Sequence, residues 1–170
     1  MHGLGNYHDA QTIYQWVRSH GSKYGRPSCC EDKSAPDGWE YVGAGCARSV
    51  WLSPEGVAYK VGHNDWAERQ QRGEIDNLTT AWELGAPEGV RFPKFDSFDI
   101  DIEDGQETVV VIELIVGDRL YDYAAKSGHE RDLLYDRLAL CETRLKLVDL
   151  HDENALVDED GLLVPVDFGC

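Results

Sequence analysis

The stretch that decides the fold is Asp149-Leu150-His151-Asp152-Glu153-Asn154, which Asp167-Phe168-Gly169 follows thirteen positions after Asn154. An Asp and an Asn thus stand five positions apart, with a second Asp farther on. Amide and carboxylate oxygens are the ligands that Mg²⁺ prefers, and a carboxylate can also orient or deprotonate a hydroxyl group. The order and spacing of these groups indicate a site for phosphoryl transfer.

The segment between the two motifs has the pattern of a β-hairpin. Ala155-Leu156-Val157 and the stretch 162–166 are short apolar runs, and Asp158-Glu159-Asp160-Gly161 between them is rich in turn formers. A hairpin would bring the two ends of this segment together. It would therefore place the Asn and the second Asp near each other.

Upstream of the hairpin, apolar spacing predicts helices over 120–126 and 130–147. The apolar stripe of the second helix consists of Leu133, Leu134, Leu138, Cys141 and Leu145. A further helix is predicted over 65–84, with its buried face formed by Ile75, Leu78, Ala81 and Trp82.

The rest of the chain is rich in strand patterns. Strands are predicted over 39–42, 48–52, 57–61, 94–102 and 107–114. Near the start, Asp9 would cap a helix that ends at His20, and Tyr14 and Trp16 favour packing into a core over contact with a partner. The residues after that helix, up to Gly38, read as a loop. The chain is therefore predicted to be α+β, with a sheet-rich first lobe and a helical second lobe.

Two early segments extend the chemical pattern. A glycine-rich turn, Gly43-Ala44-Gly45-Cys46-Ala47-Arg48-Ser49-Val50, stands between the first two strands, and the third strand ends in Val57-Ala58-Tyr59-Lys60. With these motifs, residues 39–170 resemble the protein-kinase-like superfamily. The turn keeps two of the three glycines of that family's motif, and Arg48 replaces the third.

The resemblance implies a two-lobed fold that binds ATP and Mg²⁺. Its parts would be an N-terminal extension over 1–38, an antiparallel-sheet lobe with one main helix over 39–116, and a truncated helical lobe over 117–170. The residues implied to surround the nucleotide are Gly43, Ala44, Gly45, Val50 and Lys60, together with the main chain of Glu113 and Ile115.

The resemblance also assigns catalytic roles. Asp149 would be the catalytic base, and Asn154 and Asp167 would hold the magnesium ion. Lys60 would contact the α- and β-phosphates, and a carboxylate on the following helix would hold it in place. Glu74 is the preferred carboxylate, and Glu68 is the alternative.

Two departures from the family pattern bear on the function. Leu147 and Val148 replace the usual His-Arg before the base, and the Asp-Leu-His form at His151 is similar to aminoglycoside- and choline-type kinases and atypical kinases. The sequence stops one residue after Asp-Phe-Gly, so the usual platform for a peptide substrate is expected to be missing. Compact truncated proteins of this kind resemble some encoded by bacteriophages, which would work in the host cytoplasm.

The resemblance thus implies an ATP-dependent kinase that transfers the γ-phosphate to a hydroxyl, on a protein serine or threonine or on the chain itself. Two alternatives stay open: a pseudokinase that binds nucleotide without turnover, and an acidic inhibitory module that binds a partner protein.

The composition limits the classes of partner that the chain is expected to bind. The chain of 170 residues has a formal net charge of −16, which disfavours direct binding to nucleic acid. No signal peptide or membrane-spanning run is visible, so a cytoplasmic location is expected. The five cysteines form no metal-binding spacing, although Cys29 and Cys30 are adjacent. The acceptor and the oligomeric state are left open.

Overall fold

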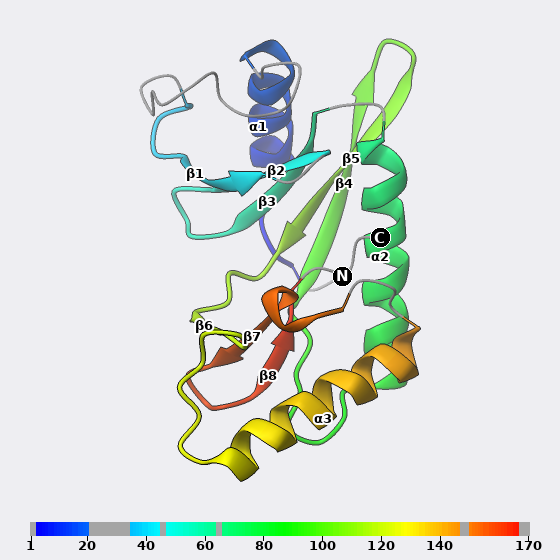
Figure 1. Cartoon of the computed structure of the whole chain (residues 1–170). Helices are drawn as coiled ribbons and strands as arrows, with labels where there is room; N and C mark the ends of the chain where they lie inside the picture. The colour runs from blue at the N-terminus through cyan, green and yellow to red at the C-terminus, as the bar shows by residue number, and fades with distance from the viewer. Residues whose placement is uncertain (1–2, 21–34, 45–46, 64–65, 147–149, 167–170) are drawn as a thin grey trace. The chain divides into compact units, whose positions relative to one another are not determined.

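The computed structural model describes residues 3–20, 35–44, 47–63, 66–146 and 150–166 (Figure 1). The chain divides into two compact units. The first unit contains residues 1–72 and 94–114, and the second contains residues 73–93 and 115–170. The predicted ranges 1–38, 39–116 and 117–170 stay predictions.

The first unit is built on a five-stranded antiparallel sheet. Its strands are β1 (Glu40–Ala44), β2 (Arg48–Leu52), β3 (Ala58–Gly62), β4 (Phe95–Ile102) and β5 (Gly105–Ile112), in the spatial order β1-β2-β3-β5-β4. Helices and an antiparallel sheet in one chain confirm the predicted α+β class. The observed strands lie within two residues of the predicted ones at each end.

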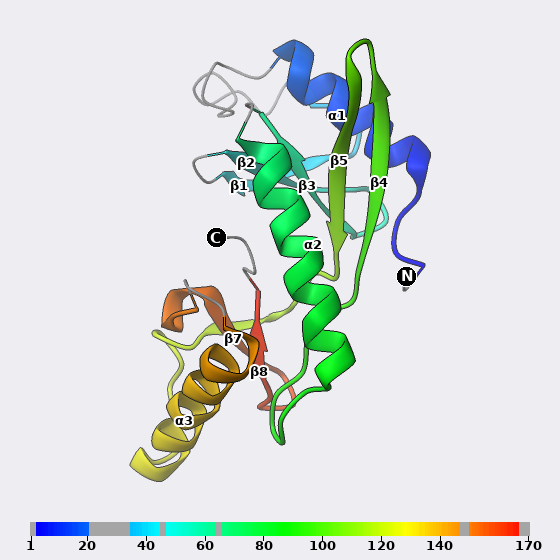
Figure 2. The same cartoon turned by 90° about the vertical axis from the view of Figure 1, so that its right-hand side faces the viewer.

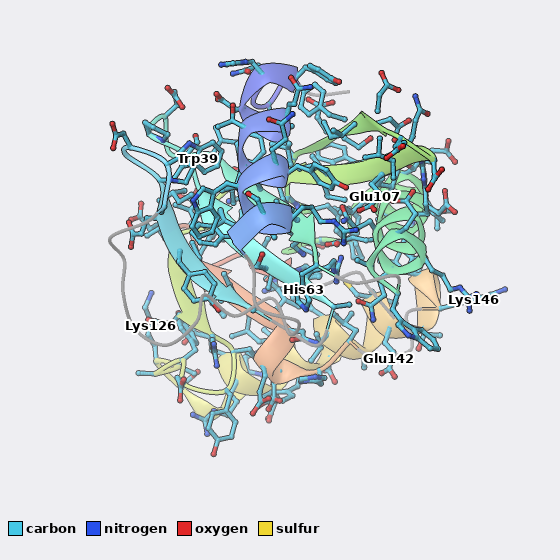
Figure 3. The ribbon with its side chains drawn as sticks, turned by 90° about the horizontal axis from the view of Figure 1, so that it is seen from above. Trp39, His63, Glu107, Lys126, Glu142 and Lys146 are labelled. Carbon is cyan, nitrogen blue, oxygen red and sulfur yellow. The ribbon has the colours of Figure 1, made fainter. Side chains whose placement is uncertain are left out.

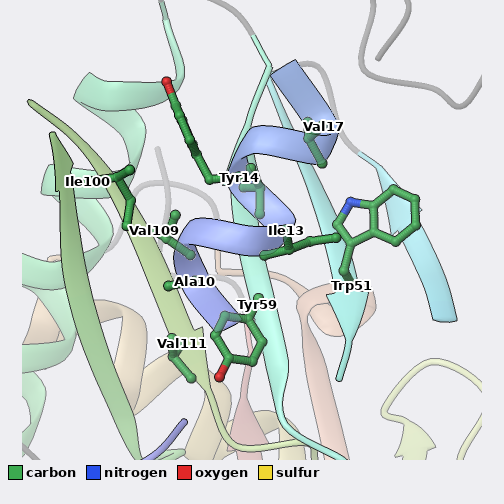
Figure 4. Close-up of a cluster of buried hydrophobic side chains, with 10 residues drawn as sticks. Ala10, Ile13, Tyr14, Val17, Trp51, Tyr59, Ile100, Val109 and Val111 are labelled. Carbon is green, nitrogen blue, oxygen red and sulfur yellow. The ribbon is translucent and has the colours of Figure 1, made fainter. Parts of the chain in front are cut away.

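Alternation along the strands gives this sheet two different faces. One face carries Trp51, Tyr59, Val109 and Val111, and the helix α1 (Tyr7–His20) packs on it through an apolar stripe (Figure 4). The buried residues of that stripe are Ala10, Ile13, Tyr14 and Val17. The predicted role of Tyr14 as a core residue is therefore confirmed. We call this face of the sheet the α1 face.

The start of α1 differs from the prediction. Asn6 caps the helix, because its Oδ1 accepts a hydrogen bond from the Asp9 N–H at 2.9 Å and its Nδ2 donates to Asp9 Oδ2 at 2.8 Å. Asp9 therefore lies inside the first turn, where it also accepts a hydrogen bond from the Tyr59 hydroxyl at 3.5 Å. Burial, aided by the Asp9 carboxylate, raises the pKa of Tyr59 to about 12.

The helix α2 (Ala67–Leu84) has a different buried stripe from the predicted one. The positions that are buried are Ala67, Gln71, Glu74, Leu78 and Ala81. Leu78 and Ala81 were expected there, but Trp82 is 41% exposed and its Nε1 donates to the Pro93 carbonyl at 3.0 Å. The buried stripe therefore includes the polar residues Gln71 and Glu74, whereas the apolar pattern predicted that Ile75 and Trp82 would belong to it.

The second unit contains a small three-stranded antiparallel sheet. Its strands are β6 (Gly117–Arg119), β7 (Ala155–Asp158) and β8 (Leu163–Pro165), in that spatial order. The predicted hairpin is β7-β8, which confirms the reading of residues 155–166. The segment after α2 pairs with the other edge of β8 through an isolated parallel bridge between Val90 and Leu163. The short strand β6 was not expected.

The helix α3 (Gly128–Leu145) lies between the residues labelled Lys126 and Lys146 in Figure 3. Ser127 caps it by accepting a hydrogen bond from the Glu130 N–H at 3.1 Å. Of the predicted apolar stripe, all members except Leu133 are buried. The helix predicted over 120–126 is wrong, because that stretch forms turns that lead into the Ser127 cap.

In the part of the chain that the structure describes, no helix is both long and apolar enough to cross a lipid bilayer.

Candidate functional site

Lys60 lies in the middle of a buried apolar strand face. It is directly opposite Val50 of β2 and Val110 of β5, so the three side chains share one face of the sheet. Ala58, two residues earlier, shares that face, and Lys60 itself is only 8% exposed. We call this side of the sheet, opposite to the α1 face, the Lys60 face.

The first turns of α2 cover the Lys60 face, and α1 lies on the other side of the same strands (Figure 2). Gly62 shows how close this contact is, because a Cβ there would lie 2.5 Å from the Cβ of Ala67. Gln71 Oε1 accepts a hydrogen bond from the Val110 N–H at 3.2 Å. The helix thus reaches the strand position that is paired with Lys60.

Glu74 lies on the same stripe of α2 as Gln71, three residues farther on, and is 0% exposed. A buried carboxylate needs a partner, and neither Glu74 nor Lys60 is without one. Glu68, the alternative carboxylate, is engaged elsewhere. It accepts hydrogen bonds from the Thr108 N–H at 2.8 Å and from Arg72 Nε at 2.7 Å. Glu68 is therefore held by β5 and by its own helix, and the assignment of Glu74 to Lys60 stays a prediction.

The glycine-rich turn begins in β1, where Gly43 lies opposite Val50. A Cβ added at Gly43 would meet no described atom within 4 Å, so packing within the described residues does not require glycine there. Ala44 is the last residue of β1, and Gly45 lies outside the described residues. An open side at Gly43 is compatible with the close approach of a ligand to the backbone.

Glu113 follows β5 and is tied to the residue before β4. Its N–H donates to the Lys94 carbonyl at 2.9 Å, and its Oε2 accepts from the Lys94 N–H at 3.0 Å. The N–H of Glu113 is therefore used within the chain, in the contact with Lys94. Ile115, the other predicted contact, is half-buried and belongs to the second unit.

In the second unit, Asn154 closes a short 3₁₀ turn, Asp152–Asn154. Its carbonyl accepts a hydrogen bond from the Val166 N–H at 3.0 Å, and its Nδ2 lies 3.1 Å from His151 Nε2. Val166 directly precedes Asp167 in the sequence. The hairpin therefore returns the chain to Asn154 at the residue before the second predicted magnesium ligand.

Asp149 and Asp167 themselves lie outside the described residues, as do Cys29 and Cys30. Among the residues that the structure describes, no three His, Cys, Asp or Glu side chains form a group able to hold a metal ion. The candidate magnesium site depends on an Asn and on an Asp beyond that part of the chain. Its predicted ligands therefore stay predictions.

Asp158 fixes the turn of the β7-β8 hairpin. Its Oδ1 accepts hydrogen bonds from the N–H groups of Asp160 and Leu162, and its Oδ2 accepts from Arg91 Nε at 2.7 Å. Burial alone would raise the pKa of Asp158, but the hydrogen bonds from Arg91 and the backbone outweigh it and lower the pKa. The carboxylate thus links the segment after α2 to the hairpin that leads toward Asp167.

The sequence reading missed the polar contacts that hold α2 on β5. Gln71 and Thr108 read as ordinary helix and strand residues, and Glu68 was considered only as an alternative partner of Lys60, because their true partners are about forty positions away in the sequence. One signal was available. Gln71, Glu74, Leu78 and Ala81 follow a helical spacing, so two polar residues extend the stripe that Leu78 and Ala81 begin.

No protein-family profile and no curated protein matches the sequence significantly. Among solved structures, the chain is similar to a pseudokinase in its apo form, with 12% sequence identity and a TM-score of 0.48. The matched region covers 76% of this chain and 56% of that one, so the chain spans little more than half of that protein's length.

Proposed function

We propose that this chain binds ATP together with Mg²⁺ and transfers the γ-phosphate to a hydroxyl group. The observation that carries the proposal is the setting of Lys60. Its amine stands on an apolar strand face between Val50 and Val110, and the helix that covers this face carries a fully buried Glu74. A lysine held by a carboxylate is the arrangement that presents a fixed positive charge to the α- and β-phosphates.

The residues around Lys60 also fit a nucleotide. Val50 and Ala58 offer apolar contacts for a purine ring, and the backbone at Gly43 has open space beside it. The carbonyl of Glu113 would accept a hydrogen bond from the adenine amino group. The resemblance implied Gly43, Val50 and Glu113, and Ala58 is added here because it shares the Lys60 face; all four belong to the first unit.

Asn154 and Asp167 would hold Mg²⁺, whose charge would offset the negative charge of the phosphates. The hydrogen bond from Val166 to the Asn154 carbonyl supports this pairing, since Val166 precedes Asp167. In the reaction, the acceptor oxygen would bond to the γ-phosphorus, and the bond from that phosphorus to the β,γ-bridging oxygen would break. ADP would leave, and Asp149 would take the hydroxyl proton.

A second candidate is nucleotide binding without turnover, which would use the same phosphate-binding residues. The acceptor is proposed to be a protein serine or threonine, or a hydroxyl of the chain itself. An acidic module that binds a partner protein would need no nucleotide at all. Binding and transfer are therefore measured separately.

Thermal unfolding with and without ATP and Mg²⁺ tests the binding. At a ligand concentration of about one hundred times Kd, the melting temperature of the wild type should rise by about 5–10 °C. Lys60→Met and Asp167→Ala should lose most of this rise. Lys126→Met makes the same charge change at an exposed residue and should keep it. A wild type that gains no stability from ATP overturns the proposal.

Transfer is measured with γ-labelled ATP, on the chain itself and on an added protein rich in serine and threonine. Label should appear with the wild type and be lost in Asp149→Asn, which keeps the shape of the side chain. Nucleotide-dependent stabilisation without any label would select the second candidate, a binding protein without turnover.

A further inference from the structure

The first turns of α2 are joined to β5 by hydrogen bonds from side chains to the backbone. β3 pairs with β5 only from Lys60↔Val110 to Ala58↔Ile112. At Val110 and at Thr108, two residues beyond, the N–H groups donate to Gln71 Oε1 at 3.2 Å and to Glu68 Oε2 at 2.8 Å. Residues two apart in a strand direct their N–H groups to the same side. The side chains of Gln71 and Glu68 thus accept hydrogen bonds from β5 beyond the end of its pairing with β3.

These contacts are buried and connected to one another. Gln71 is 2% exposed and Thr108 is 1% exposed, so water does not readily replace the helix as a partner of the two N–H groups. The Thr108 hydroxyl contributes as well, because it lies 3.0 Å from Glu68 Oε1 and 2.9 Å from Asp99 Oδ1. Arg72 of α2 donates to Asp99 at 3.0 Å and closes the network.

Close packing fixes the same part of the helix from the side of β3. A Cβ at Gly62 would lie 2.5 Å from the Ala67 Cβ and 3.0 Å from Gln71 Nε2. The helix therefore approaches the strand as near as a glycine allows. Rotation of α2 about its axis would break the contacts of Glu68 and Gln71 together.

We infer that Glu68 and Gln71 are positioning residues, which hold the first turns of α2 on β5 and so fix the rotation of the helix and the direction of its Glu74, whether or not nucleotide is bound. The inference rests on the proposed function. Its basis is that α2 is one continuous helix, in which Gln71 and Glu74 are three residues apart on one stripe. Fixing the rotation of the helix at Gln71 fixes the direction of Glu74.

Amide hydrogen exchange tests the anchoring without any ligand. Gln71→Met keeps the length of the side chain but removes the acceptor, and Glu68→Met does the same for Thr108. The exchange of the Val110 amide should become faster in the first variant, and that of the Thr108 amide in the second. Glu68→Gln keeps an acceptor oxygen and should retain the protection of Thr108. Unchanged exchange in both methionine variants overturns the anchoring.

The affinity for ATP with Mg²⁺ then tests the positioning. Glu68→Met and Gln71→Met should weaken binding by about tenfold, the effect expected from losing one ordinary hydrogen-bonded constraint. Glu68→Gln should bind as the wild type does, and so should Arg72→Met, which removes the ion pairs with Glu68 and Asp99 but leaves the acceptors of the two β5 N–H groups in place. Measurements well below each melting temperature separate positioning from loss of the fold.

The outcomes distinguish the two ideas. If the wild type binds nucleotide and both methionine variants bind equally well, the positioning inference fails while the proposed function stands. If the wild type binds no nucleotide, the proposed function fails and the positioning role fails with it. If Glu68→Met binds nucleotide more weakly than the wild type and Glu68→Gln binds it equally well, the inference is supported.

Discussion

Lys60 and Glu74 are charged residues that the fold almost removes from water. Lys60 stands between Val50 and Val110, and Glu74 lies on the buried stripe of α2. Burying a single charge is costly, and a pair in contact recovers much of that cost. An unpaired lysine or glutamate at such a position would destabilise the folded state, so the proposed pair should have a measurable effect on the free energy of unfolding.

A double-mutant cycle should detect this pair. Lys60→Met and Glu74→Gln should each lower the free energy of unfolding, because each leaves the other charge buried. The double variant should lose less than the sum of the two, with a coupling of about 0.5–3 kcal/mol. Denaturant unfolding gives the four free energies. A cycle of Lys60→Met with Glu68→Gln is the control and should be additive, since Glu68 bonds to Thr108 and Arg72.

Asp158 should make stability depend on pH. Its pKa is lowered in the folded chain, chiefly because the hydrogen bonds from Arg91 and the backbone outweigh the effect of burial. Its contribution is therefore present above its unfolded pKa of about 3.9 and is lost as the pH falls through the lower folded value. The stability difference between wild type and Asp158→Asn should be largest at neutral pH and shrink on acidification below about pH 4. Asp160→Asn, at an exposed neighbour, should show no such difference. A difference that stays constant with pH would contradict this role.

At the scale of elements, the strands and long helices followed from local patterns, and two of three exceptions share one cause, a contact with a distant strand. β6 has only three residues and exists because it pairs with β7, about forty positions later. The stretch 120–126 had helical spacing, but the Ser127 cap starts the helix after it. The buried stripe of α2 includes Gln71 because its partner is Val110. Local spacing cannot show a contact with a distant backbone group.

The candidate site divides in the same way. Its residues were found from motifs, because the spacing from Asp149 to Asp167 and the segment ending in Lys60 are local features of the sequence. The residues that hold these site residues in place were not found from the sequence. Gln71, Thr108 and Arg91 act through contacts between elements that are far apart in the sequence, and a single sequence contains no record of those contacts.

Gly62 should be essential to the contact between β3 and α2. Gly62→Ala would force its new methyl group to within 2.5 Å of the Ala67 Cβ, so the helix or the strand must shift. We expect a loss of about 1–3 kcal/mol in the free energy of unfolding, the usual cost of overpacking. Urea unfolding measures it. Gly128→Ala at the start of α3, where a Cβ meets no described atom within 4 Å, should cost nothing. Wild-type stability of Gly62→Ala would contradict the close contact.

At the scale of the whole molecule, the net charge of −16 has a consequence of its own. Like charges on a small folded chain repel one another, and salt screens this repulsion over about 10 Å at 0.1 M. The melting temperature should therefore rise as NaCl is raised from about 20 to about 300 mM, with a chelator present to exclude divalent ions. The double change Glu103→Gln and Asp104→Asn at the exposed turn between β4 and β5 should reduce this dependence. A melting temperature that falls with salt would show that attractive ion pairs dominate instead.

The division of the chain has a different kind of consequence. The first unit is assembled from two separate lengths of the polypeptide, with residues 73–93 of the second unit inserted between them. A premature stop or a single protease cut therefore cannot separate the first unit from the second, because even a break after Leu114 leaves residues 73–93 of the second unit attached to the first. Exchanging it between proteins would need three breakpoints, one on each side of the insertion and one after Leu114, and β4 and β5 would have to travel with the strands that precede α2.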